Sequence, residues 1–243
     1  MRKNILITGA SSGIGEAAAK YLYKNNYNVI CLGRDTRKLE QLSSELKNTI
    51  CIAYDFNDLY NIETIFEQIK ANDIKLDGLV HCAGVAPLMK IQDNDIDLML
   101  KTFNTNLFSF IELCKYFSTE KYSNSNSSIV AISSVTARVA SYRQAIYTST
   151  KAALEEAVRC MSKEFMERKI RVNCIAPGIV ETNMFKELEK QSVTLREKTE
   201  KLCPLGLIQP DNIAEIIEFV LSEKAKYMTG STIIADSEFL SWK

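Results

Sequence analysis

The stretch ILITGASSGIGEAAAKYL, residues 5–22, decides the fold of this chain. Residues 5–8 form a short apolar run that stops at Gly9, which is typical of a buried strand. The alanine-rich segment 16–22 is a strong helix former. Glycines in the turn between them let backbone amides approach a phosphate, and the amino end of a helix adds N–H donors and a positive dipole end. This order predicts a phosphate-binding turn; a tight turn that only packs the helix closely on the strand is the alternative.

The segment after this helix completes a βαβ unit, because residues 28–32 form a second apolar strand. In dinucleotide-binding folds, an acidic residue at the end of the second strand bonds the ribose 2′-hydroxyl, whereas an arginine accommodates a 2′-phosphate. Here Gly33 is followed by Arg34, which favours NADP(H) and leaves NAD(H) as the alternative if Arg34 is only a solvated loop charge. We interpret Asp35 as the N-cap of a helix over residues 36–47.

Strands alternate with helices along the rest of the chain. Further strands are expected at residues 50–54, 76–80, 129–132, 170–175 and 231–235. Helices are expected from Asn57 or Asp58 to Ala71, within 95–120, over 147–168, and from an Asp211 cap to about Ser222. The polar run 123–128 is expected to be a loop. The alternation predicts an α/β protein with a doubly wound parallel sheet of about seven strands and helices on both faces.

The chain shows no internal repeat, linker or low-complexity segment, so residues 1–243 are expected to form one domain. Ligands of such sheets bind at the carboxyl ends of the strands, and most of the candidate residues below fall at those ends. The charged, helical segment 182–203 has little apolar content, and we interpret it as a mobile lid over the substrate site.

The composition is that of an ordinary globular protein. Of 243 residues, 46% are hydrophobic and 25% are charged, with a formal net charge of +0. This balance argues against a general nucleic-acid or anionic-membrane surface. No signal peptide is apparent, and no apolar stretch reaches the ~20 residues that span a bilayer. Scattered cysteines and a single histidine predict no metal site and a reducing, cytoplasmic compartment.

A second group of chemically active residues lies in SSVTARVASYRQAIYTSTK, residues 133–151. Tyr147 stands four residues before Lys151, so on a helix the two side chains share a face. A free tyrosine titrates near pH ~10, and a neighbouring ammonium lowers its pKa toward the range useful for general acid–base catalysis. Ser134, at the end of a predicted strand, could donate a hydrogen bond to a carbonyl oxygen. A solvated helix face beside an aromatic side chain is the alternative explanation of the Tyr–Lys pair.

Taken together, these motifs resemble those of the short-chain dehydrogenase/reductases of the compact single-domain kind, over nearly the whole chain. The family's cofactor turn T-G-x-x-x-G-x-G is matched by residues 8–15, and its P-G-x-x-x-T segment by residues 177–182. The family's helix asparagine, serine and Tyr-x-x-x-Lys pair are matched by Asn106, Ser134, Tyr147 and Lys151. The resemblance implies a Rossmann-type fold and an NAD(P)-dependent oxidoreductase.

The resemblance also implies a role for each matched residue. Tyr147 would be the general acid in ketone reduction, or the base in the reverse direction. Lys151 would lower the pKa of Tyr147 and hold the nicotinamide ribose. Ser134 would polarise the substrate oxygen, and Asn106 would hold a water that links Lys151 to solvent. Val180 and Thr182 would fix the carboxamide, and Asp55 and Phe56 the adenine. The implied cofactor-binding residues are Gly9, Ser11, Ser12, Gly13, Ile14, Gly15, Arg34, Asp55, Phe56, Cys82, Ala83, Gly84, Tyr147, Lys151, Pro177, Gly178, Val180 and Thr182.

The chain departs from the family pattern at three places. The family commonly has Asn-Asn-Ala-Gly after the fourth strand, whereas this chain has His81-Cys82 before Ala83 and Gly84, and we interpret His81 as a packing residue. The family's Asp-Gly-Gly after the last strand is replaced by Asp-Ser-Glu at 236–238, which changes a substrate wall or a subunit contact. Many NADP-using relatives carry a basic residue at the position of Ser12, so phosphate recognition would depend mainly on Arg34.

Several functions fit this pattern. The first is an NADPH-dependent ketoreductase acting on a 3-oxoacyl thioester, because Gln144 and the run around it are similar to those of 3-oxoacyl-acyl-carrier-protein reductases. Arg138 and Arg143 could meet an acidic carrier protein, or could simply be loop charges. The second is the same chemistry on a sugar, sterol or other small alcohol or ketone. The third is a non-catalytic NADP-binding sensor or subunit, against which the intact Ser134, Tyr147 and Lys151 argue.

The resemblance implies a homotetramer or homodimer that forms through the helices of residues 95–120 and 146–168. Nucleotide-sugar epimerases share the fold but usually need a longer substrate domain, for which 243 residues leave little room. The sequence names neither the substrate nor the physiological direction of the reaction.

Overall fold

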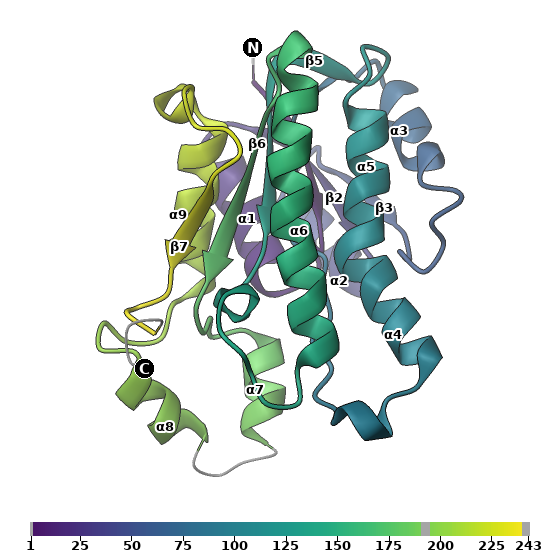
Figure 1. Cartoon of the computed structure of the whole chain (residues 1–243). Helices are drawn as coiled ribbons and strands as arrows, with labels where there is room; N and C mark the ends of the chain where they lie inside the picture. Colours follow the sequence, from purple (N-terminus) through teal and green to yellow (C-terminus); the bar gives the residue numbers. More distant parts are fainter. Residues whose placement is uncertain (1, 191–194, 240–243) are drawn as a thin grey trace.

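A seven-stranded parallel sheet in the order β3-β2-β1-β4-β5-β6-β7 forms the centre of the molecule (Figure 1). The structure is a computed structural model that describes residues 2–190 and 195–239. Its strands are β1 (Asn4–Thr8), β2 (Asn28–Gly33), β3 (Ile50–Ala53), β4 (Leu76–His81), β5 (Ser123–Ile132), β6 (Arg171–Pro177) and β7 (Thr232–Ala235). Because the strand order reverses between β1 and β4, this is the predicted doubly wound Rossmann-type fold, with its switch point at the carboxyl ends of these two strands.

Helices cover both faces of the sheet (Figure 1). One face carries α3 (Glu63–Lys70), α4 (Ile96–Phe103), α5 (Ser109–Phe117) and α6 (Ala145–Glu164). The other carries α1 (Gly13–Lys24), α2 (Thr36–Glu45) and α9 (Pro210–Leu221). The remaining helices, α7 (Asn183–Glu189) and α8 (Leu195–Leu202), lie beyond the carboxyl end of β6.

Alternation along the strands supplies both cores. Leu6 faces the core under α3, α5 and α6, whereas Ile5 and Ile7 face the core under α1, α2 and α9. All three side chains are at most 1% exposed. Strands of a parallel sheet that are buried on both faces are apolar runs, which is the pattern seen in residues 5–7.

Three predicted boundaries were wrong. The polar run 123–128 is not a loop but the first half of β5, where Ser123 pairs with Leu76 and Ser128 with Gly78 across an irregularity in the register. The helix expected to start at Asn57 or Asp58 starts at Glu63, because Asp58 instead accepts hydrogen bonds from the backbone N–H groups of Tyr60 and Asn61 and forms a turn.

The third boundary is the start of α9. Pro210 is its first residue, and Asn212 Oδ1 accepts a hydrogen bond from Gln209 N at 3.1 Å, so Asp211 lies inside the first turn and is not the cap. The Asp35 cap was correct, because its carboxylate accepts from Lys38 N at 3.2 Å.

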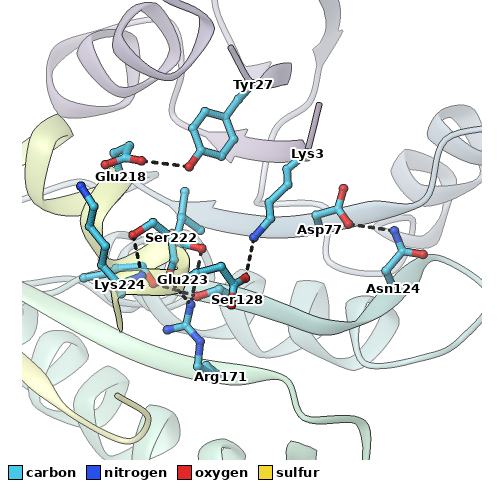
Figure 2. Close-up of polar contacts among 12 residues, drawn as sticks. Lys3, Tyr27, Asp77, Asn124, Ser128, Arg171, Glu218, Ser222, Glu223 and Lys224 are labelled. Atoms are coloured by element: carbon cyan, nitrogen blue, oxygen red, sulfur yellow. Dashed lines mark hydrogen bonds and ion pairs between the residues drawn. The ribbon is translucent and has the colours of Figure 1, made fainter. Parts of the chain in front are cut away.

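Polar contacts tie together the amino edge of the sheet (Figure 2). Arg171, at the start of β6, donates to the carbonyl oxygens of Leu221 and Ser222 at the end of α9. Lys3, before β1, pairs with Glu223 at 3.0 Å. A cation at a helix carboxyl end satisfies free carbonyl groups and complements the helix dipole. These contacts fix α9 against the sheet at the edge opposite the candidate site.

Candidate active site

The glycine turn lies at the carboxyl end of β1, against the end of β4. Gly9 has φ of +68°, and a Cβ added there would lie 2.8 Å from Ala83 N. A Cβ at Gly15 would lie 2.3 Å from Gly9 O. Ser12 is the N-cap of α1, is exposed, and makes no capping hydrogen bond through its side chain. The amino end of α1 is therefore open to an anion above a turn that has no room for side chains.

Two neighbouring segments border this turn. Ser11 approaches the end of β2 so closely that a Cβ at Gly33 would lie 2.8 Å from Ser11 Oγ. On the other side, a Cβ at Gly13 would lie 3.2 Å from Thr182 Cγ2. The 177–182 segment is itself held by the bond from Gly178 N to Ala235 O at 2.8 Å. A groove of about 250 Å³ lies beside the turn, with Gly13, Glu16, Thr182 and Asn183 among its lining residues.

Ser134, Tyr147 and Lys151 come together where β5 ends and α6 begins. Lys151 Nζ is buried, donates to Ile132 O at 2.7 Å, and lies 5.8 Å from the centre of the Tyr147 ring. The predicted i, i+4 placement of tyrosine and lysine on one helix is therefore present. The Ser134 hydroxyl is hydrogen-bonded to the half-buried Tyr147.

The pKa of Tyr147 shifts in the opposite direction to the one predicted from the sequence. Burial raises it, and the hydrogen bond with Ser134 only partly offsets this. The Lys151 ammonium donates to Ile132 O, and burial lowers the pKa of Lys151 to about 8. Tyr147 therefore keeps its proton near neutral pH, which is the form that a general acid requires.

Asn106 lies in η2 (Asn104–Phe108), a π-helical turn between α4 and α5. Its side chain is fully buried and bonds Val85 through both backbone groups, at 2.8 Å to N and 2.9 Å to O. Its Nδ2 also donates to Thr150 Oγ1 at 3.0 Å. A Cβ at Gly84 would lie 3.5 Å from both Asn106 Oδ1 and Lys151 Nζ, so the two side chains flank the same glycine. The hydrogen bonds to Val85 and Thr150 account for this buried amide in mid-helix, and π-turns are common at functional sites.

The remaining cofactor candidates lie along the carboxyl edge. Arg34 is exposed directly after β2. Asp55 accepts from the backbone and side-chain nitrogens of Asn57, both at 3.0 Å. Phe56 is only 5% exposed and its ring packs against Tyr54, so the ring belongs to the core.

Other candidates lie nearer the switch point and in the loop before α6. Val180 is buried, and Thr182 Oγ1 accepts from the N–H of Phe185 in the first turn of α7. Burial raises the pKa of the Cys82 thiol to about 12, which keeps it unreactive. Gln144 is the half-buried N-cap of α6 and makes no capping bond with its side chain.

His81 is placed as a packing residue. It is fully buried between the rings of Phe56 and Phe110, at centroid distances of 6.2 and 5.3 Å. Thr8 Oγ1 accepts from Ala83 N at 3.1 Å and is hydrogen-bonded to His81 Nδ1 at 3.1 Å. Burial lowers the pKa of His81 to about 3, so the ring is neutral.

Two residues that the sequence reasoning did not single out hold the loop that carries Ser134. Thr136 N and Oγ1 bond Ser134 Oγ at 3.2 and 3.0 Å. Glu155, one turn after Lys151 on α6, is buried and accepts from Ser133 Oγ and from Arg138 Nη2, both at 2.9 Å. No sequence signal distinguishes Thr136, whereas an acidic residue on the otherwise buried face of α6 is a weak signal for Glu155.

Within residues 2–190 and 195–239, no group of three or more His, Cys, Asp or Glu side chains could hold a metal ion. No helix in that part of the chain is long and apolar enough to cross a membrane.

A glycine turn at the switch point of a doubly wound sheet, with a Tyr–Lys pair on the adjoining edge, is the architecture of nicotinamide-dependent oxidoreductases. Within that class, this chain belongs to the short-chain dehydrogenase/reductase family. The family model that matches residues 9–237 is described as "Enoyl-(Acyl carrier protein) reductase". A nicotinamide cofactor is therefore part of its chemistry.

Several relatives cover nearly the whole chain. Carbonyl reductase family member 4 of Xenopus laevis is 30% identical over 240 residues, covering 97% of each chain. The 3-oxoacyl-(acyl-carrier-protein) reductase of Rickettsia prowazekii is 35% identical over 239 residues, covering 95% of this chain and 94% of the relative. Among solved structures, a 4-hydroxyisoleucine dehydrogenase complexed with NADH superposes with a TM-score of 0.90 at 28% identity, over 100% of both chains.

Proposed function

We propose that this protein reduces a ketone to a secondary alcohol with NADPH, and that its substrate is a 3-oxoacyl thioester. The observation that carries the proposal is the meeting of Ser134, Tyr147 and Lys151 beside Gly84, at the edge where the glycine turn lies open. A pure cofactor-binding protein needs no proton donor at this place. The similarity to 3-oxoacyl and carbonyl reductases supports ketone reduction.

The residues along the carboxyl edge fit a dinucleotide. The turn from Gly9 to Gly15 and the open amino end of α1 would hold the pyrophosphate, Asp55 and the Phe56 backbone the adenosine, and Lys151 the nicotinamide ribose. Val180 and Thr182 would hold the carboxamide. When bound, the reduced nicotinamide supplies the hydride. The protein supplies orientation and the proton.

The proton step belongs to the chain's own side chains. Ser134 donates a hydrogen bond to the substrate carbonyl oxygen, and Tyr147 donates its phenolic proton to that oxygen as negative charge develops. The raised pKa of Tyr147 keeps this proton in place until then. The buried Lys151, next to Asn106 across Gly84, returns the proton through water held at Asn106.

The catalytic domain in this proposal is the whole chain, residues 1–243, with residues 182–203 as a lid over the substrate. Residues 191–194 of this segment lie outside the described part. In the remainder, Arg196 of α8 bonds Glu189 of α7 at 2.6 Å and Glu181 at 2.8 Å. Two helices joined to each other and to the 177–182 segment can move together, which suits a lid.

The proposed substrate class is tested by measuring the rate of NADPH oxidation with each member of a panel of 3-oxoacyl thioesters, sugars and sterols. We expect saturable turnover of a thioester such as acetoacetyl-coenzyme A, with sugars and sterols slower. Turnover confined to a sugar or sterol would keep the ketoreductase chemistry and replace the substrate. Binding of NADPH with no turnover of any panel member would favour a non-catalytic sensor or subunit.

Cofactor preference is tested with Arg34→Ala. Arg34 is exposed at the end of β2, where an arginine can bond a 2′-phosphate. A charge-assisted hydrogen bond contributes about 1.5–3 kcal/mol, so we expect NADPH affinity to fall by roughly 10- to 100-fold and NADH affinity to stay unchanged. Fluorescence titration measures both.

Lys224→Ala is the matched control for Arg34→Ala, because it removes a cation at the opposite edge of the sheet (Figure 2). Unchanged NADPH affinity in Arg34→Ala, or NADH binding by the wild type that is equal to or tighter than NADPH binding, would show that Arg34 is only a loop charge. The NADH complex of the 4-hydroxyisoleucine dehydrogenase keeps NAD(H) as the alternative.

We further propose a homodimer or homotetramer built on α4, α5 and α6. Ile96, Leu100 and Phe108 follow one another at four- and eight-residue spacing and are 58%, 48% and 38% exposed. Apolar side chains repeated on one helical face are typical of an interface. Light scattering should give two or four times the chain mass, and Leu100→Glu should lower it. A monomer at micromolar concentration would reject the assembly.

A further inference from the structure

The Ser134 hydroxyl has little freedom in the hydrogen bonds it can make. A serine hydroxyl has one hydrogen to donate and two lone pairs that accept. Thr136 contributes two donors to Ser134 Oγ, its backbone N–H at 3.2 Å and its side-chain hydroxyl at 3.0 Å. With both lone pairs occupied, the only hydrogen bond left to Ser134 is one that it donates.

The donor count leaves Tyr147 as the acceptor of the one hydrogen of Ser134. The hydrogen bond between these two side chains lowers the pKa of Tyr147 and partly offsets the effect of burial. Since Ser134 has one hydrogen, it cannot also donate to Thr136 Oγ1. Thr136 is therefore the donor in the Ser134–Thr136 pair.

We propose that Thr136 is a positioning residue that makes Ser134 an obligate hydrogen-bond donor, toward Tyr147 in the resting site and toward the substrate oxygen during the reaction. Without the Thr136 hydroxyl, one lone pair of Ser134 is free and can accept the proton of Tyr147. Tyr147 would then point its proton at Ser134 in place of the substrate, and neither group would serve the carbonyl oxygen.

The loop around Thr136 is held firmly enough for this role. Thr136 lies in η3 (Val135–Ala137), a single 3₁₀ turn whose N-cap is Ser134 and whose Val135 side chain is buried. The buried Glu155 carboxylate holds both ends of the loop, through Ser133 Oγ and Arg138 Nη2 at 2.9 Å each. A paired, hydrogen-bonded carboxylate in a buried position keeps one geometry, because leaving it unpaired is costly.

This inference rests on the proposed ketone reduction. It is tested by two measurements, and one of them, the pH titration of Tyr147, needs no substrate. Thr136→Val keeps shape and the backbone N–H but removes the hydroxyl, whereas Thr136→Ser restores it. Thr148→Val is the matched control. Within the described part of the chain, the Thr148 hydroxyl has no hydrogen-bond partner, although it neighbours Tyr147 in sequence.

We expect Thr136→Val to lower kcat with acetoacetyl-coenzyme A by roughly 3- to 10-fold, the value of one lost hydrogen bond, with unchanged KM for NADPH. Thr136→Ser and Thr148→Val should keep the wild-type kcat. If the wild type turns over another ketone of the panel and not the thioester, that ketone is used, which separates failure of the substrate proposal from failure of this one.

The measurement that needs no substrate is a pH titration of Tyr147. It is monitored by NMR of isotope-labelled tyrosine, and the Tyr147 signal is assigned with Tyr147→Phe. We expect the midpoint to rise in Thr136→Val and to return to the wild-type value in Thr136→Ser. Wild-type kcat and an unshifted Tyr147 midpoint in Thr136→Val would overturn the proposal. A kcat loss that Thr136→Ser does not rescue and that follows a lower thermal midpoint would show a structural role only.

Discussion

Replacing Tyr147 by phenylalanine should abolish most turnover, with a loss in kcat of about 10²- to 10⁴-fold, the range of a missing general acid. The substitution removes the phenolic oxygen that is hydrogen-bonded to Ser134 and leaves the half-buried ring in place on α6. Because the ring and Lys151 remain, NADPH affinity should stay within about twofold of the wild type. Steady-state NADPH oxidation gives kcat, and fluorescence titration gives the affinity.

Tyr142→Phe is the matched control, because Tyr142 lies in the loop just before α6, five residues from Tyr147, but is 78% exposed. It should keep the wild-type kcat. If Tyr147→Phe retained a tenth or more of the activity, the proton donor would have to be another group. If it lost NADPH binding in parallel with turnover, the loss would report the cofactor site and not the proton step.

The second large effect is on stability, at Gly9. An alanine there must adopt φ of +68°, and its Cβ would lie 2.8 Å from Ala83 N and 2.9 Å from the carbonyl carbon of Cys82. Both neighbours are backbone atoms of the β4 end and cannot rotate away. Left-handed strain and overpacking together should lower the free energy of unfolding by about 2–4 kcal/mol. Urea denaturation measures this, and NADPH titration should show weakened binding since the turn must shift.

Gly206→Ala separates the two causes. Gly206 also has a positive φ, +87°, but a Cβ there meets nothing within 4 Å. In Gly206→Ala, backbone strain alone should lower the free energy of unfolding, by about 1–2 kcal/mol, and NADPH affinity should be unchanged. Equal destabilisation of the two variants would mean that the close approach of the β1 and β4 ends contributes nothing at Gly9.

Much of the fold can be predicted from local pattern. The apolar runs at residues 5–7 and 29–32 are buried strands, and the Asp35 cap was placed correctly, because periodicity and capping depend on neighbours in sequence. The errors arose where tertiary pairing outweighed local preference. Residues 123–128 read as a polar loop but form a strand, because β4 offers them a hydrogen-bonding partner.

For the candidate site too, some features could be predicted from local sequence and others could not. Residue type and spacing identify Ser134, Tyr147 and Lys151 as a chemical group, since four residues separate two positions on one helical face. The pKa of Tyr147 was predicted with the wrong sign, because the sequence shows that a lysine is near but not that the tyrosine is buried deeply enough for burial to raise its pKa. Burial and hydrogen-bond direction depend on elements distant in the chain.

The sequence by itself predicted the doubly wound fold, the family and the candidate reactive side chains, because each prediction depends on short motifs whose physics is local. Only the tertiary structure decided how those side chains are held. The approach of β4 to the glycine turn places Ala83 against Gly9, and the packing of α6 on the end of β5 brings Glu155 to the loop that carries Ser134 and Thr136. Such contacts join residues far apart in the chain, and no spacing in the sequence encodes their distances or the direction of their hydrogen bonds.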